Sequence, residues 1–116
     1  MNVRSAKAKG RRLQNHVRDI LQELFKPFLD PDDIKSQTMG MTGEDIVLSP
    51  AAQKCIKYSF ECKNVERLNL WASLDQAETN SSDRNPVLII KKNKSKIYAV
   101  IEFNHFMELI DPNGKN

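Results

Sequence analysis

Apolar positions near the start of the chain recur every three or four residues, which is typical of one stripe of an amphipathic helix. They are Leu13, Val17, Ile20, Leu21, Leu24 and Phe28. The spacing predicts a helix over residues 6–25 that ends near Pro27. The sequence Asp-Pro-Asp-Asp at residues 30–33 then predicts a turn, because proline fixes φ and aspartate side chains bond nearby backbone amides.

The middle of the chain changes to short β-branched runs, which indicate strands. We expect strands over residues 34–38, 46–48 and 57–63, with a glycine loop at 39–43. The second and third of these strands should pair across a connection at residues 50–56.

The second half predicts a helix, two strands and a last helix. Asn64 can cap a helix over residues 65–78, in which Trp71 shares an apolar face with Leu74 and is expected in the core. Strands follow over 87–91 and 96–103, and a short helix over 104–110. The order α-βββ-α-β-β-α predicts an α/β sandwich, a central mixed β-sheet flanked by helices, in a single domain over residues 1–116.

Basic side chains are concentrated at the N-terminus, although the net charge of the 116 residues is only +3. Six of them precede the first acidic residue, Asp19: Arg4, Lys7, Lys9, Arg11, Arg12 and Arg18. Such an excess attracts phosphate groups, but a solvated tail has the same composition, so charge alone leaves both interpretations open.

Length and apolar content narrow the class of protein. The apolar runs are far shorter than the roughly 20 residues that cross a bilayer, so we expect a soluble, intracellular (cytoplasmic) protein with no membrane partner. Cys55 and Cys62 are too few for a disulfide framework, and zinc-ligand spacing is absent from the sequence. A chain this short buries limited surface, which favours a homodimer.

Candidate chemistry lies on the strands expected at 46–48 and 57–63. Alternation places Glu61 and Lys63 on the face opposite Tyr58, Phe60 and Cys62. Asp45 begins the preceding strand after a glycine loop that can aim its carboxylate at the same point. Two carboxylates with additional backbone and water oxygens suit Mg²⁺, which would bind a scissile phosphate and activate water while the lysine stabilises charge.

The spacing alone has a simpler interpretation, in which Glu61 and Lys63 form an exposed ion pair and Glu44 and Asp45 a solvated turn. The combination is more specific: an amphipathic helix, Gly-Glu-Asp-Ile-Val at 43–47, an apolar strand that ends in Phe-Glu-Cys-Lys at 60–63, then a helix. Over residues 7–105 this order resembles the PD-(D/E)XK nucleases, in particular Holliday-junction resolvases and related phage and prophage endonucleases. The resemblance implies a restriction-endonuclease-like sandwich.

Carried over residue by residue, the resemblance implies that Asp45 and Glu61 bind Mg²⁺, with Mn²⁺ able to substitute, and that Lys63 is catalytic. Gln14 stands where the family's first helix often supplies a glutamate. Glutamine binds a cation more weakly, so it would hold a metal-bound water or a phosphate, or be a surface amide. Gln76 is a candidate DNA contact on the helix expected at 65–78.

Three functions follow as hypotheses. The first is a metal-dependent endonuclease that hydrolyses phosphodiester bonds in branched DNA, such as a Holliday-junction resolvase, either of a cell or encoded by a phage and acting in the host cell. The second is a nicking or double-strand endonuclease with sequence preference, of the homing or mobile-element kind. The third is a non-catalytic DNA-binding protein. In each, DNA would be contacted by Lys7, Lys9, Arg11, Arg12, Arg18 and Gln76.

Overall fold

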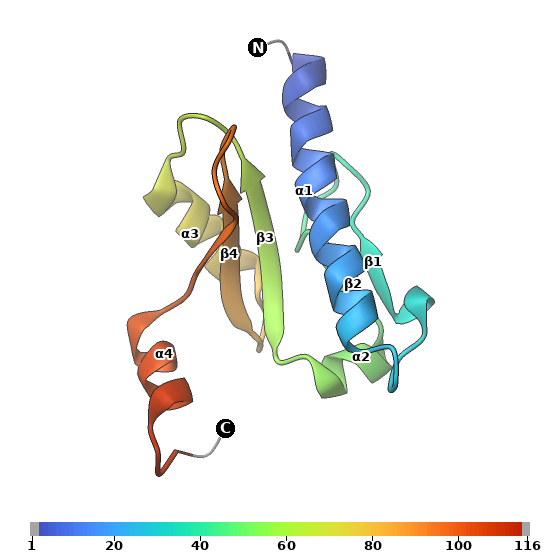
Figure 1. Ribbon diagram of the computed structural model, residues 1–116, viewed down its shortest axis with the longest axis vertical. Helices are drawn as coiled ribbons and strands as arrows, with labels where there is room; N and C mark the ends of the chain where they lie inside the picture. Colours follow the sequence, from blue (N-terminus) through green and yellow to red (C-terminus); the bar gives the residue numbers. More distant parts are fainter. Residues whose placement is uncertain (1–2, 115–116) are drawn as a thin grey trace.

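A computed structural model describes residues 3–114 of the protein as a mixed α/β fold (Figure 1). Its helices are α1 (Val3–Leu24), α2 (Pro50–Cys55), α3 (Leu70–Asn80) and α4 (Phe103–Ile110), with a 3₁₀ turn, η1, at Pro31–Asp33. Its strands are β1 (Ile34–Ser36), β2 (Ile46–Leu48), β3 (Tyr58–Asn64), β4 (Asn85–Lys91) and β5 (Tyr98–Val100). None of the described helices is long and apolar enough to cross a membrane.

The strands form two small sheets. β1 and β2 are an antiparallel pair, whereas β3 runs parallel to β4 and β4 antiparallel to β5. Between the two sheets, the described residues form one backbone hydrogen bond, in which the amide of Asp45 donates to the carbonyl of Phe60 at 3.0 Å. The expected ladder between residues 46–48 and 57–63 is therefore wrong, and the contact is made just before β2 begins.

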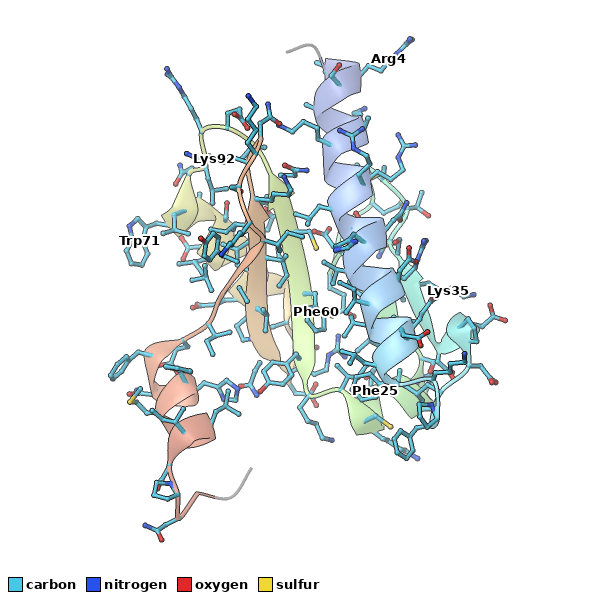
Figure 2. The ribbon with its side chains drawn as sticks, viewed as in Figure 1. Arg4, Phe25, Lys35, Phe60, Trp71 and Lys92 are labelled. Carbon is cyan, nitrogen blue, oxygen red and sulfur yellow. The ribbon has the colours of Figure 1, made fainter. Side chains whose placement is uncertain are left out.

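Helices cover both faces of the three-stranded sheet. Helix α1 packs on β3 and β1, and α3 packs on β3 and β4 (Figure 1). The main apolar cluster lies on the α1 side and consists of Leu13, Val17, Leu21, Leu29, Ile34, Ile46, Leu48, Ala52, Ile56, Cys62, Val87 and Ile89. Tyr58 and Phe60 pack against this cluster, so the apolar face expected for the third strand is confirmed (Figure 2).

The segment expected to be a plain connection at 50–56 is instead helix α2. Pro50 occupies its first turn, where a missing amide hydrogen costs nothing, and the Ser49 side chain accepts a hydrogen bond from the Ala52 amide. The same hydroxyl donates to Asp33 at 2.7 Å, which ties the helix to the 3₁₀ turn. The observed order is thus α-β-β-α-β-α-β-β-α, one helix more than the sequence predicts.

Helix α3 begins five residues later than expected. Its cap is Asn69, whose side chain accepts from the Ala72 amide at 3.1 Å. Asn64 stays in β3, opposite Lys91 of β4, and its amide group donates to the Lys9 carbonyl. A cap at either asparagine fits the sequence locally, and the parallel pairing of β3 with β4 decides between them.

Two other expectations are wrong, one about packing and one about the length of a strand. Trp71 is 75% exposed and points away from the protein (Figure 2), because α3 begins at Leu70 and its first turn extends past the edge of the sheet. The strand expected over 96–103 is limited to the three residues of β5, and α4 begins at Phe103.

The cap of α3 gives a test of the corrected boundary. Replacing Asn69 with Ala removes the side-chain acceptor for the Ala72 amide, which should lower the free energy of unfolding by about 1 kcal/mol, as measured by urea denaturation. Asn69→Asp keeps the acceptor and should stay within a few tenths of a kcal/mol of wild type. Equal stability of the Ala and Asp variants would show that Asn69 does not cap the helix.

Candidate active site

Asp45 is held in place mainly by backbone contacts. It follows a loop in which Gly40 and Gly43 have φ values of 86° and 104°, a region that glycine enters without steric cost. One carboxylate oxygen, Oδ2, accepts a 2.6 Å hydrogen bond from the Cys62 amide of β3. The loop therefore turns the Asp45 side chain toward the centre of the neighbouring strand, as the sequence predicts.

Glu61 and Lys63 lie on the α3 face of β3, two residues apart. Glu61 is only 2% exposed, whereas Lys63 is half-buried. The Lys63 ammonium is 3.7 Å from Oε2 of Glu61, and the Asn80 amide of α3 donates to Oε1 at 3.4 Å. Burial of Glu61 argues against the alternative of an exposed surface ion pair, because a carboxylate withdrawn from water costs free energy that a surface pair does not incur.

A cavity of about 170 Å³ brings together five of the residues expected at the site: Gln14, Asp45, Glu61, Lys63 and Gln76. Its remaining wall is made by Gly10, Cys62 and residues 37–41 of the loop between β1 and β2. Helix α1, the loop, β3 and α3 all contribute, so the site exists only in the folded chain.

Both carboxyl groups have raised pKa values, mainly because both are withdrawn from water. The pKa of Glu61 is raised to about 7, first by burial and then by the nearby Asp45 charge, while Asn80 and Lys63 oppose the rise. Burial also raises the pKa of Asp45, against the Cys62 hydrogen bond and the Lys63 charge. Burial beside this acidic pair raises the pKa of the Cys62 thiol as well, so the thiol stays protonated at neutral pH.

Gln14 lines the cavity and is not the surface amide of the simpler interpretation, and its side-chain nitrogen holds the glycine loop. Its buried side-chain nitrogen donates to the Gln37 and Asp45 carbonyls, both at 2.8 Å. Since only the amide nitrogen can donate, these two bonds fix the orientation of the group. Gln14 thus attaches α1 to both sides of the glycine loop and sets the backbone position of Asp45.

Two features of the site were missed by the sequence analysis. Asn80, which lies beyond the helix expected at 65–78, donates to both the Glu61 carboxylate and the Gly43 carbonyl, the latter at 3.1 Å. Glu44 contacts Arg84 and accepts from Ser59 at 2.8 Å, which directs it away from Asp45. Local sequence gives no signal for either, because both contacts join segments at least 15 residues apart.

The residues present fit a hard divalent cation with two protein carboxylates. In residues 3–114 there is no group of three or more His, Cys, Asp or Glu side chains that could hold a metal. Mg²⁺, however, is often held by one or two carboxylates, with water and substrate phosphate as the other ligands. A cation would also relieve the repulsion that raises the pKa of Glu61.

The basic residues of α1 fall on two sides of the helix. Lys7, Arg11 and Arg18 lie at i, i+4 and i+11 on the stripe that contains Gln14, next to the cavity. Lys9 is buried and paired with Glu66 at 3.3 Å, so its ammonium is less accessible than expected. Arg12 lines a separate hollow with His16 and Lys91, while Arg18 also contacts Asp19.

Comparison with protein-family models gives no match, and neither the curated proteins nor the solved structures contain a significant match to this chain.

The shared burial of the carboxyl pair predicts a pH-dependent stability without metal. Because the pKa of Glu61 in the folded protein lies above its value in the unfolded chain, stability is lost as the pH rises through about 7. Glu61→Gln carries no charge and should be more stable than wild type by up to about 3 kcal/mol at pH 8, with little gain at pH 5.

Thermal and urea unfolding in a chelating buffer between pH 5 and pH 8 would measure this difference. Glu23→Gln, which changes an exposed carboxylate on α1, is the matched control and should show no such trend. A Glu61→Gln protein less stable than wild type at pH 8 would contradict the assigned cause.

Proposed function

We propose that the protein is a metal-dependent DNA endonuclease of the PD-(D/E)XK kind, with a restriction-endonuclease-like arrangement of its helices and sheet. The observation that supports this most directly is the cavity in which Asp45, Glu61 and Lys63 meet. Burying two carboxylates together weakens a fold unless a cation offsets their repulsion. A site for Mg²⁺ and a phosphodiester would account for this cost. It would also account for the Lys63 ammonium, which is 3.7 Å from Glu61.

The reaction is hydrolysis of one phosphorus–oxygen bond of the DNA backbone by water. The divalent cation supplies Lewis-acid polarisation of the scissile phosphate when bound. Asp45 and Glu61 would hold the cation, and the Cys62 amide and Asn80 orient these two carboxylates. The Lys63 ammonium stabilises the negative charge that develops on the phosphate oxygens as water adds and the leaving oxygen departs with a proton.

The substrate that we propose is branched DNA, namely a Holliday junction. The described residues form no module beyond two small sheets and four helices with which to read bases, and their exposed cations suit phosphates. Recognition would then depend on the shape of the backbone. Cleavage of immobile four-way junctions, flaps and linear duplexes tests this, and junction-independent cutting at one sequence would favour a homing-type endonuclease instead.

Lys63 separates binding from catalysis. Lys63→Ala should retain the fold and bind DNA within a few fold of wild type, yet cleave at least about 100-fold more slowly in Mg²⁺, because it removes a charge used in the transition state. Asp45→Asn should also lose cleavage, with partial recovery at raised Mg²⁺ because a ligand rather than the lysine is missing. Single-turnover cleavage across a range of Mg²⁺ concentrations measures both.

Lys57→Ala is the matched control, since Lys57 precedes the same strand but is exposed and lies outside the cavity. It should cleave like wild type. A Lys63→Ala protein that cuts at nearly the wild-type rate would exclude the assignment. Mg²⁺ calorimetry that shows no binding, or the same binding in Asp45→Asn, would favour a non-catalytic DNA-binding protein.

The two sides of α1 give a test of the DNA path. Arg11 lies on the stripe beside the cavity, whereas Arg12 faces the separate hollow. Arg11→Ala should weaken binding to all DNAs and make the salt dependence less steep by about one unit of log Kd per log salt concentration, because one phosphate contact is lost. Arg12→Ala is the comparison, with a smaller expected effect. Fluorescence anisotropy at several salt concentrations measures the slopes, and an unchanged slope for Arg11→Ala would place the DNA elsewhere.

A further inference from the structure

Helix α4 presents its apolar side to water. Phe103, Phe106 and Ile110, at i, i+3 and i+7, are 69%, 46% and 58% exposed. The opposite side of the helix contacts the protein through His105, whose Nε2 lies 2.8 Å from the Tyr58 hydroxyl. An amphipathic helix of a monomer normally buries its apolar stripe, so this orientation indicates that another surface covers it.

An apolar groove of about 350 Å³ lies beside the start of α4. Its walls come from α3, β4, β5 and the start of α4, and include Leu70, Leu74, Leu88, Val100 and Phe103. Trp71 extends from its edge into solvent (Figure 2). The apolar helix face and this apolar groove are therefore neighbours on one side of the molecule.

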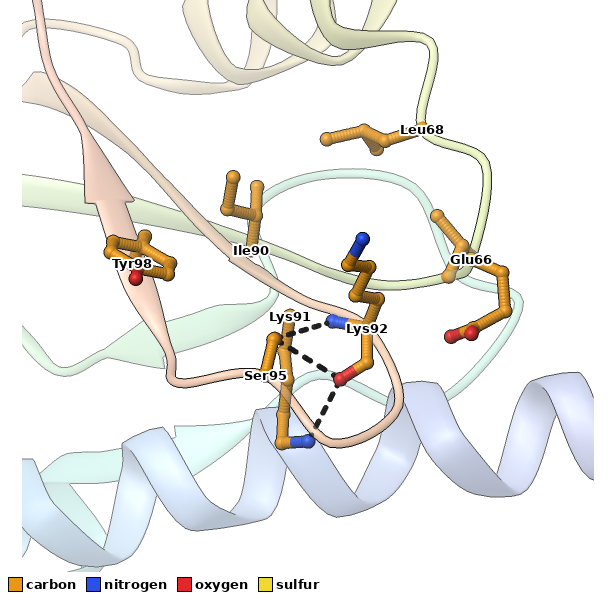
Figure 3. A pocket seen from close by; sticks show the side chains of 8 residues that line it. Glu66, Leu68, Ile90, Lys91, Lys92, Ser95 and Tyr98 are labelled. Carbon is orange, nitrogen blue, oxygen red and sulfur yellow. Dashed lines mark hydrogen bonds between the residues drawn. The ribbon is translucent and has the colours of Figure 1, made fainter.

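The same surface continues toward the β4–β5 turn. Leu68, Ile90 and Tyr98 line a second hollow of about 170 Å³ (Figure 3). Tyr98 and Val100 are two residues apart in β5 and so share the face of the sheet that carries α3. We use "α3–α4 patch" for the exposed apolar side chains of this surface: Trp71, Tyr98, Phe103, Phe106, Leu109 and Ile110.

We propose that the α3–α4 patch is the interface with a second copy of the chain, in which α4 of each protomer lies in the groove of its partner. A two-fold interface must be self-complementary, and this chain carries both the apolar helix and the apolar groove that such an exchange needs. From their exposed fractions, the six side chains present roughly 700 Å² per protomer, close to the ~800 Å² that each partner contributes to a stable interface.

The helix does not fill its own groove. Glu102 and Phe103 form part of the groove wall, and α4 leads away from that wall (Figure 1). The groove and the catalytic cavity have no lining residue in common, so a partner seated on the patch leaves Asp45 and Lys63 accessible. Dimer formation through the patch therefore does not depend on nuclease activity.

Trp71 is the single tryptophan of the chain and reports on the interface directly. As the full chain is concentrated, sedimentation equilibrium should show a dimer, and tryptophan emission should shift to shorter wavelength with reduced quenching by acrylamide. A protein that remains monomeric at about 100 µM, where even a micromolar interface is filled, would overturn the proposal. A dimer whose Trp71 remains fully accessible to acrylamide would overturn it too.

Phe106→Asp and Trp71→Ala each remove an apolar contact without emptying a monomer core, and each should raise the dimer dissociation constant at least about 30-fold. Phe28→Ala is the matched control, because Phe28 is 76% exposed but lies outside the patch, and its dissociation constant should match wild type. Circular dichroism checks that each monomer is folded. Equal dissociation constants for the three variants would exclude this surface.

Discussion

Two carboxyl groups placed together inside a small protein cost electrostatic free energy, and the rest of the site is arranged around that cost. Asp45 and Glu61 are brought side by side by a glycine loop and a central strand, and neither has a full complement of positive partners. One amide of β3, one asparagine of α3 and one lysine offset part of that cost. The elements around the cavity keep these few donors in position, because small displacements would leave buried charge uncompensated.

Helix α1 contributes to this arrangement in two ways. Its apolar stripe packs against the strands, which fixes the helix over the face of β3 that bears Cys62. Near its middle the same side carries Gln14, whose two hydrogen bonds fasten the glycine loop. One helix therefore sets both the core and the approach to the cavity, and its exposed cations lie along that approach. A glutamine satisfies the two loop carbonyls directly, which a carboxylate could not do because it lacks a donor.

Much of the site could be predicted from sequence because its central geometry is local. Alternation along β3 is enough to put Glu61 and Lys63 together and opposite Phe60, and a glycine loop before Ile46 is enough to place Asp45 near them. The partners of those residues were not predictable, since Asn80 reaches Glu61 only after α3 folds back across the sheet. The same limit explains the exposed Trp71, whereas helix α2 had a local signal in the Ser49 cap and Pro50 that the prediction did not use. Apolar spacing identifies a face, but whether that face meets this chain or another surface depends on tertiary and quaternary packing.

Asp45 also joins the β1–β2 hairpin to the rest of the sheet, through the one backbone hydrogen bond that the described residues form between the two sheets. One of the two residues that would hold the metal thus also connects the two sheets. Because Ile34 and Ile46 of the hairpin are fully buried in the main apolar cluster, the hairpin cannot open without disrupting the core that holds Asp45 beside Glu61. In the proposed nuclease, a newly made or partly unfolded chain would then lack a complete site. Its DNA-cutting activity would begin only once the core around the hairpin has formed.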